Sequence, residues 1–225
     1  MSLLLHAITP IEAADPAPTG LRGQPLIRVE EQGLAAWATE FHPSLDQLTR
    51  EDLLSHHALV MRLHQLHVSV APARFPTWLA DVEAARHLIE SRCGELSSTL
   101  EKVRECTELS VTAVWLTADD DGAPVPDAAT PGRRYLLERQ QAFAGSDRRH
   151  QRARELADEV ERLVGPDLVE AQRRVCPSTT VAASIALLVP RARAAEVKAR
   201  LSPVEPGVRI LVNGPWPPYS FVDIG

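Results

Sequence analysis

Apolar and polar positions in the first half of the chain follow both strand-like and helix-like periods. Short apolar runs bounded by turn residues predict strands, and apolar residues three and four apart predict helices. The predicted strands are residues 3–8, 26–30, 34–38 and 68–71, with the second and third forming a hairpin. The predicted helices run from the capping hydroxyl of Thr49 to about His67 and from about Thr77 to about Val103, with a turn at Pro72–Pro76 between strand and helix. We expect residues 9–25 to form a mobile loop.

The second half alternates strands with helices. The predicted strands are residues 109–115, 182–189 and 208–212. A long helix should begin at Thr130-Pro131 and stop at Gly165-Pro166, followed by a shorter helix to about Arg174 and another over residues 192–201. Asp119–Gly122 should form an acidic turn and residues 123–129 an exposed loop. Strands packed on helices in this order predict an α+β fold.

The last predicted strand runs into an octet, Gly214-Pro215-Trp216-Pro217-Pro218-Tyr219-Ser220-Phe221. Its three prolines remove backbone donors, so the octet can be neither helix interior nor central strand. A stiff segment that presents aromatic rings loses little entropy when it docks. Two interpretations follow: a staple onto the protein's own core, which the chemistry favours because unanchored termini fray, or an anchor for a partner.

The composition of the chain argues against several classes of protein. A net charge of −6 over 225 residues gives no basic field for nucleic acid or an anionic membrane. The three cysteines are odd in number and lack a CxxC pair, which favours reduced thiols over a disulfide framework. The short apolar run at the N-terminus is too short for a signal peptide, and no apolar run is long enough to span a membrane. We therefore expect a cytoplasmic protein.

No motif indicates catalysis or a cofactor. His57, His64 and His67 could share a helical face, but no carboxylate lies at a matching offset, so we expect no metal site. Asp119–Asp121 lack the spacing of a calcium loop, and nucleophile-elbow, P-loop and dinucleotide motifs are missing. The arginines of the long helix, from Arg133 to Arg154, alternate with acids and indicate an ion-paired surface.

The octet resembles the carboxy-terminal signature of the gas vesicle protein F and L family, which it matches at all eight positions. Two further stretches resemble the family. His56-His57 precedes Pro72-Ala73-Arg74-Phe75, although this chain has Pro76 where the family usually has glycine and Trp78 where it has a small aliphatic residue. Gly132-x-x-Tyr135-Leu136 is similar to the motif at the head of the family's long helix.

This resemblance implies two domains: an α+β domain over residues 1–105, and a modified ferredoxin-like domain over residues 106–225 with a tail at 214–225. It implies no enzyme and no cofactor, but a protein of gas vesicle assembly that binds the hydrophobic shell protein and other accessory proteins in the cytoplasm and at the gas vesicle. The candidate partner-binding residues are Arg74, Phe75, Trp216, Tyr219 and Phe221.

An alternative of another class is a small-molecule-binding or enzymatic α+β domain. It predicts a pocket lined by His57, His64, Arg74 and Trp78.

Overall fold

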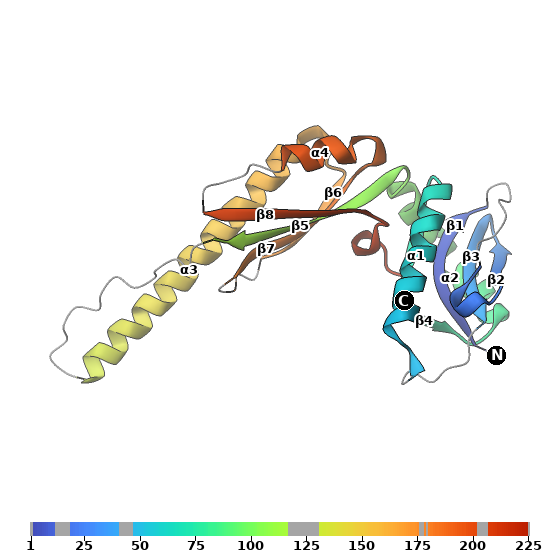
Figure 1. Cartoon of the computed structure of the whole chain (residues 1–225), viewed down its shortest axis with the longest axis horizontal. Helices are drawn as coiled ribbons and strands as arrows, with labels where there is room; N and C mark the ends of the chain where they lie inside the picture. Colours follow the sequence, from blue (N-terminus) through green and yellow to red (C-terminus); the bar gives the residue numbers. More distant parts are fainter. Residues whose placement is uncertain are drawn as a thin grey trace. The chain divides into compact units, whose positions relative to one another are not determined.

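The chain forms two compact units, Met1–Glu108 with Pro215–Gly225 and Leu109–Gly214 (Figure 1). The computed structural model describes residues 2–11, 19–40, 47–116, 131–175, 178, 180–201 and 207–224. The predicted turn at Asp119–Gly122, the loop at 123–129, the cap at Thr130 and residues 12–18 of the loop predicted at 9–25 lie outside these residues.

The first unit is built on a four-stranded antiparallel sheet in the order β2-β3-β1-β4. Its strands are β1 (Leu3–Pro10), β2 (Leu26–Glu31), β3 (Leu34–Glu40) and β4 (Ala71–Leu79). The predicted hairpin of β2 and β3 is confirmed: Glu31 pairs with Leu34, and Gln32 and Gly33 both have positive φ, 45° and 78°. Two positive φ values are the signature of the tight turns that match strand twist.

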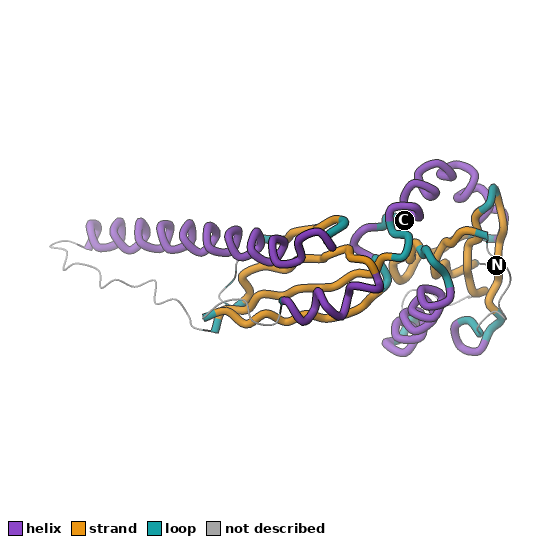
Figure 2. The backbone as a smooth tube through the Cα atoms, turned by 90° about the horizontal axis from the view of Figure 1, so that it is seen from above, coloured by secondary structure: helices purple, strands orange, loops and turns teal. Residues whose placement is uncertain are grey.

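Two helices, α1 (Arg50–Leu66) and α2 (Val82–Lys102), lie on opposite faces of this sheet (Figure 2). The central strands β1 and β3 are buried almost throughout, as expected for a sheet covered on both sides. The start of α1 is confirmed, because the Thr49 hydroxyl accepts a hydrogen bond from the Asp52 N–H (3.2 Å). Leu63 of α1 then packs against Ala7 and Trp37.

The predicted turn between Pro72 and Pro76 is wrong. β4 runs through both prolines and pairs with β1 on each side of an irregularity, Ala7 facing Pro72 and Leu5 facing Thr77. Because β4 is an edge strand, its prolines need no partner on the outer side. The second helix consequently begins later than predicted, at Val82 after the cap Asp81.

The second unit contains a second four-stranded sheet, in the order β6-β7-β5-β8. In chain order the elements are β5 (Cys106–Trp115), α3 (Pro131–Val164), β6 (Glu170–Arg174), β7 (Val181–Pro190), α4 (Ala194–Arg200) and β8 (Val208–Trp216). β5 begins, and β8 ends, in residues that belong to the first unit. Side chains of α3 and α4 share one core with the sheet, so both helices cover the same face. The first half of α3 extends beyond the ends of the strands (Figure 1).

The end of α3 at Gly165, whose φ is +60°, agrees with the prediction. The shorter helix predicted up to Arg174 is wrong, because these residues form β6, antiparallel to β7. Ala171 packs on the core of the second unit, while Arg173 reaches back to Asp158 and Glu161 of α3. A five-residue edge strand is too short to show its period in the sequence.

All of the octet except Gly214 belongs to the first compact unit. The resemblance implies that residues 214–225 belong to the second domain; in the structure, Pro215–Gly225 groups with the first compact unit. The physical reason is burial, since Phe221, Val222 and Ile224 are each at most 5% exposed. The chain therefore begins and ends in the same unit.

Candidate functional site

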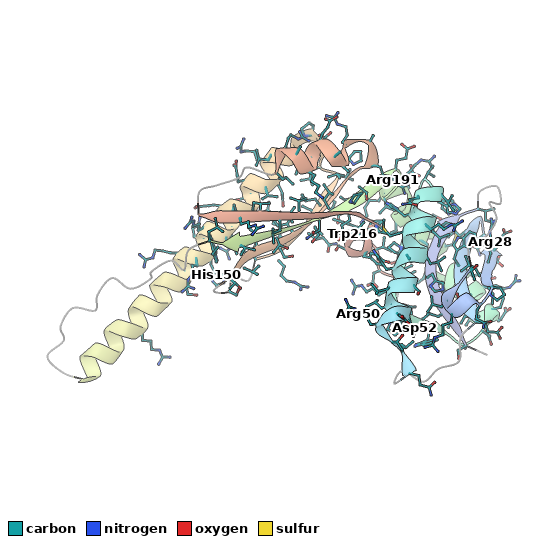
Figure 3. All side chains as sticks on the ribbon, in the orientation of Figure 1. Arg28, Arg50, Asp52, His150, Arg191 and Trp216 are labelled. Atoms are coloured by element: carbon teal, nitrogen blue, oxygen red, sulfur yellow. The ribbon has the colours of Figure 1, made fainter. Side chains whose placement is uncertain are left out.

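The octet begins at Gly214, whose φ of +114° favours glycine because a side chain would clash with the backbone there. Trp216 is the last residue of β8 (Figure 3), and a 3-10 helix, η5, follows at Tyr219–Phe221. Pro217, Pro218 and Phe221 are buried, whereas Trp216 is 36% exposed. The octet thus has one face in the core and one face toward solvent.

Hydrogen bonds from β5 hold the octet. The Thr107 hydroxyl donates to the Trp216 carbonyl (2.8 Å), and the Glu108 carboxylate accepts both the N–H and the hydroxyl of Ser220 (2.8 Å each). Burial raises the pKa of Glu108, and the two bonds from Ser220 act in the opposite direction by favouring the ionised carboxylate. These are structural contacts, as the staple interpretation predicts.

His57 of α1 joins the octet to the helix. Its ring centroid lies 5.3 Å from that of Trp216 and 6.0 Å from that of Tyr219, nearly parallel to the latter at 28°. Burial, followed by the charge of Glu108, raises the pKa of Tyr219. The phenol therefore stays neutral and serves as a flat, half-buried wall.

Beside this wall lies an open groove of about 380 Å³ in the first unit. The residues that line it are Leu53, Leu54, His56, His57, Arg74, Phe75 and Tyr219. Leu53 and Leu54 are 47% and 54% exposed, which is unusual for neighbouring leucines on a helix that also packs on a core. The groove is therefore largely apolar, with one cationic side chain.

Beneath the groove, His56 belongs to a chain of hydrogen bonds between uncharged groups. Because the Ala73 carbonyl only accepts, His56 Nε2 must donate to it (3.2 Å), so His56 Nδ1 accepts from His6 Nδ1 (2.9 Å). His6 Nε2 then accepts from the Thr39 hydroxyl (2.8 Å). Burial lowers the pKa of His6 to about 3, and that of His56 to about 4. A proton on either ring would disrupt this order of donors.

The first turn of α1, next to the groove, is held by Asp52. Its carboxylate accepts the Thr49 N–H (2.9 Å) and two bonds from the Arg22 guanidinium (2.7 and 2.8 Å). The bonds from Arg22 are the main reason that the pKa of Asp52 lies far below its usual value. This fixed turn sets the position of Leu53 and Leu54.

The structure unites most of the candidate partner-binding residues. Arg74, Phe75 and Tyr219 line the groove, and Trp216 lies against His57 at its side. Phe221, at 4% exposed, is an interior anchor and presents no surface. The exposure of Leu53 and Leu54 could not be predicted from the sequence, because leucines at helical spacing usually belong to the buried face of a helix.

The pocket predicted by the alternative interpretation is not assembled as expected. The groove contains His57 and Arg74, but neither of the other two residues. His64 is buried next to Thr107, and Trp78 packs near Leu4 and Leu21.

Two further findings apply to the residues that the structure describes. They contain no group of three or more histidine, cysteine, aspartate or glutamate side chains placed to hold a metal ion. No helix among them has the length and apolar character of a membrane span.

Comparison with known proteins gives concordant matches. Residues 2–223 match the family described as "Gas vesicle synthesis protein GvpL/GvpF". Gas vesicle protein L2 of Halobacterium salinarum is 27% identical over 202 residues, which cover 79% of this chain and 72% of that protein. The crystal structure of gas vesicle protein GvpF from Anabaena sp. PCC7120 covers 100% of this chain and 99% of its own, with a TM-score of 0.80 at 18% identity. For GvpF from Microcystis aeruginosa both coverages are 98%, with a TM-score of 0.74 at 16% identity.

Proposed function

Because the chain belongs to the gas vesicle synthesis protein GvpL/GvpF family, we propose that it binds the hydrophobic shell protein while the gas vesicle is being built. A shell subunit that exposes apolar surface would aggregate unless a partner covers that surface before incorporation. In this role the protein works in the cytoplasm and at the growing vesicle, alongside other accessory proteins. It needs neither a catalytic residue nor a cofactor.

The observation that best supports this proposal is the groove in the first unit. It brings together two stretches that resemble the family, Arg74-Phe75 and the octet residue Tyr219, which are far apart in sequence. Its exposed leucines supply apolar contact area, and its aromatic side chains lose little entropy on binding. Trp216, exposed beside His57, extends this surface. The proposed contact residues are therefore Leu53, Leu54, Arg74, Phe75, Trp216 and Tyr219.

We also propose that the two compact units are separate domains and that the second is a modified ferredoxin-like domain. Its elements follow the order β5-α3-β6-β7-α4-β8, with β5 next to β7 and β8. A strand-helix-strand pattern repeated twice in one sheet is typical of that fold. In this proposal the octet links the domains covalently, because the chain returns from β8 to the first unit.

A co-expression pull-down tests the binding role. The intact protein should retain the gas vesicle shell protein, and a Leu53→Asp/Leu54→Asp variant should retain at least about tenfold less, because burying one leucine stabilises a complex by about 1.5 kcal/mol or more. Leu66→Asp is the matched control, since Leu66 is 42% exposed on the same helix but does not line the groove.

Circular dichroism melts of all three proteins distinguish lost binding from lost folding. Matching melts with reduced retention only in the groove variant would support the proposal. A well-folded intact protein that retains no shell protein, or equal retention by all three proteins, would overturn it.

A further inference from the structure

The charge of the groove is decided by Arg74. Its side chain is exposed and lines the groove, and it forms no ion pair or hydrogen bond with any residue that the structure describes. No carboxylate is present in the lining. In the adjoining first turn of α1, Arg50 (Figure 3) and Glu51 do not line the groove. A partner in the groove therefore meets apolar walls and one unpaired cation.

The edge strand beside the groove and the lining of the groove distinguish between two ways of binding a peptide. An extended peptide binds by adding a strand to a sheet edge, which requires regular backbone donors and acceptors. β4 is the edge strand here, but Pro72 and Pro76 have no N–H, and the pairing with β1 is interrupted between them. Side chains from α1, β4 and η5 form the walls, so a partner has to bind through its own side chains, as an amphipathic helix does.

We propose that the groove binds an amphipathic helical segment whose apolar residues are accompanied by one acidic residue, and that Arg74 selects that acid. This inference deepens the proposed function and rests on it, because it names the feature of the partner that is recognised. The leucines and Phe75 contact the apolar stripe of the segment. The guanidinium pairs with its carboxylate at the rim, where such a pair adds specificity more than affinity.

Fluorescence anisotropy with synthetic helical peptides tests the selection. Three labelled peptides share an apolar stripe of leucines and carry glutamate, glutamine or lysine one helical turn away. The wild-type protein should bind the glutamate peptide about two- to fivefold more tightly than the glutamine peptide, as expected for a solvent-exposed ion pair. It should bind the lysine peptide most weakly. In Arg74→Glu the order should reverse.

Arg62→Glu is the matched control. Arg62 is exposed on α1, does not line the groove, and changes the net charge by the same amount when replaced. This variant should keep the wild-type preference. Equal reversal in both variants would assign the preference to net charge and overturn the proposal.

Other outcomes would also overturn it. Equal affinity of the wild-type protein for all three peptides would leave Arg74 without a selective role. Self-association of the chain that disappears in Leu54→Asp would make a second copy the occupant. If the shell protein is retained through the groove while the peptides show no charge preference, this inference fails and the proposed function stands. If the acidic peptide is preferred but no shell protein is retained, the proposed function fails and the inferred partner is then a different protein.

Discussion

Ser220 donates two hydrogen bonds to the buried carboxylate of Glu108, one from its backbone N–H and one from its hydroxyl. Each donor–acceptor distance is 2.8 Å. The two residues are 112 positions apart. Glu108 lies near the start of β5, and Ser220 lies inside η5 of the octet. This contact fixes the end of the chain to the first unit, and it orients the neighbouring Tyr219 as a wall of the groove.

Removing the hydroxyl tests this contact. Ser220→Ala should lower the free energy of unfolding by about 1–2 kcal/mol, because Glu108 loses one of two hydrogen bonds while it stays buried. Chemical denaturation measures the change. Ser97→Ala, at an exposed position of α2, should change stability by less than about 0.5 kcal/mol. An equal loss in both variants would contradict the role of Ser220.

Two aromatic residues of the octet should behave differently. Phe221→Ala should cost about 3–5 kcal/mol of unfolding free energy, since the ring is 4% exposed and its removal leaves a cavity. Trp216→Ala should cost at most about 2 kcal/mol, because the indole is 36% exposed, but it should reduce retention of the shell protein. Thermal melts and the pull-down separate the two effects. Equal destabilisation by both variants would make Trp216 a core residue.

Asp52 should stabilise α1 through the cap and through Arg22. Asp52→Ala should lower the free energy of unfolding by about 2 kcal/mol. Asp52→Asn should cost less, because an amide oxygen can still accept the Thr49 N–H and the partly exposed Arg22 can be hydrated. The pKa of Asp52 is lowered, so its contribution is present above its usual value of 3.8 and is lost below it. Urea titrations at neutral and acidic pH check both points, and an Asn variant as unstable as the Ala variant would contradict the ranking.

The His6–His56 pair should make stability depend on pH. Both pKa values lie below the usual 6.5, at about 3 and about 4, so the unfolded chain binds more protons between pH 6.5 and 4. The free energy of unfolding should therefore fall as pH falls through this window, by up to about 1.4 kcal/mol per pH unit for each histidine. Glu108, with its raised pKa, acts in the opposite sense above its usual value of 4.5.

Denaturation curves at a series of pH values measure this slope. His56→Gln should reduce the slope, and His87→Gln, at an exposed position of α2, should leave it unchanged. An unchanged slope in His56→Gln would contradict the assignment to the buried pair.

Sequence patterns succeeded wherever a local signal was strong. The Thr49 cap, the Gly33 hairpin and the stop at Gly165 each depend on residues within a few positions of one another. The sequence patterns gave wrong predictions for two strands at the edges of the sheets, β4 and β6. Prolines are compatible with β4 because this strand has no neighbour on its outer side in the described sheet. The edge strand β6 was missed because its five residues are too few to show a period.

In the candidate site, too, local motifs could be predicted from the sequence and long-range contacts could not. The motifs at Arg74-Phe75 and in the octet were visible in the sequence, and they were sufficient to indicate the family. Nothing local indicated that Leu53 and Leu54 would be exposed, or that His6 would pair with His56 across 50 positions.

By itself the sequence determined the α+β character, the start of α1 at Thr49, the end of α3 at Gly165 and a rigid aromatic end, because each depends on backbone preferences of neighbouring residues. Only the tertiary structure decided that this end returns to the first unit and closes a groove with α1 and β4. That outcome depends on burial of Phe221 and on a carboxylate 112 residues away from its partner, and such contacts leave no periodicity in the chain.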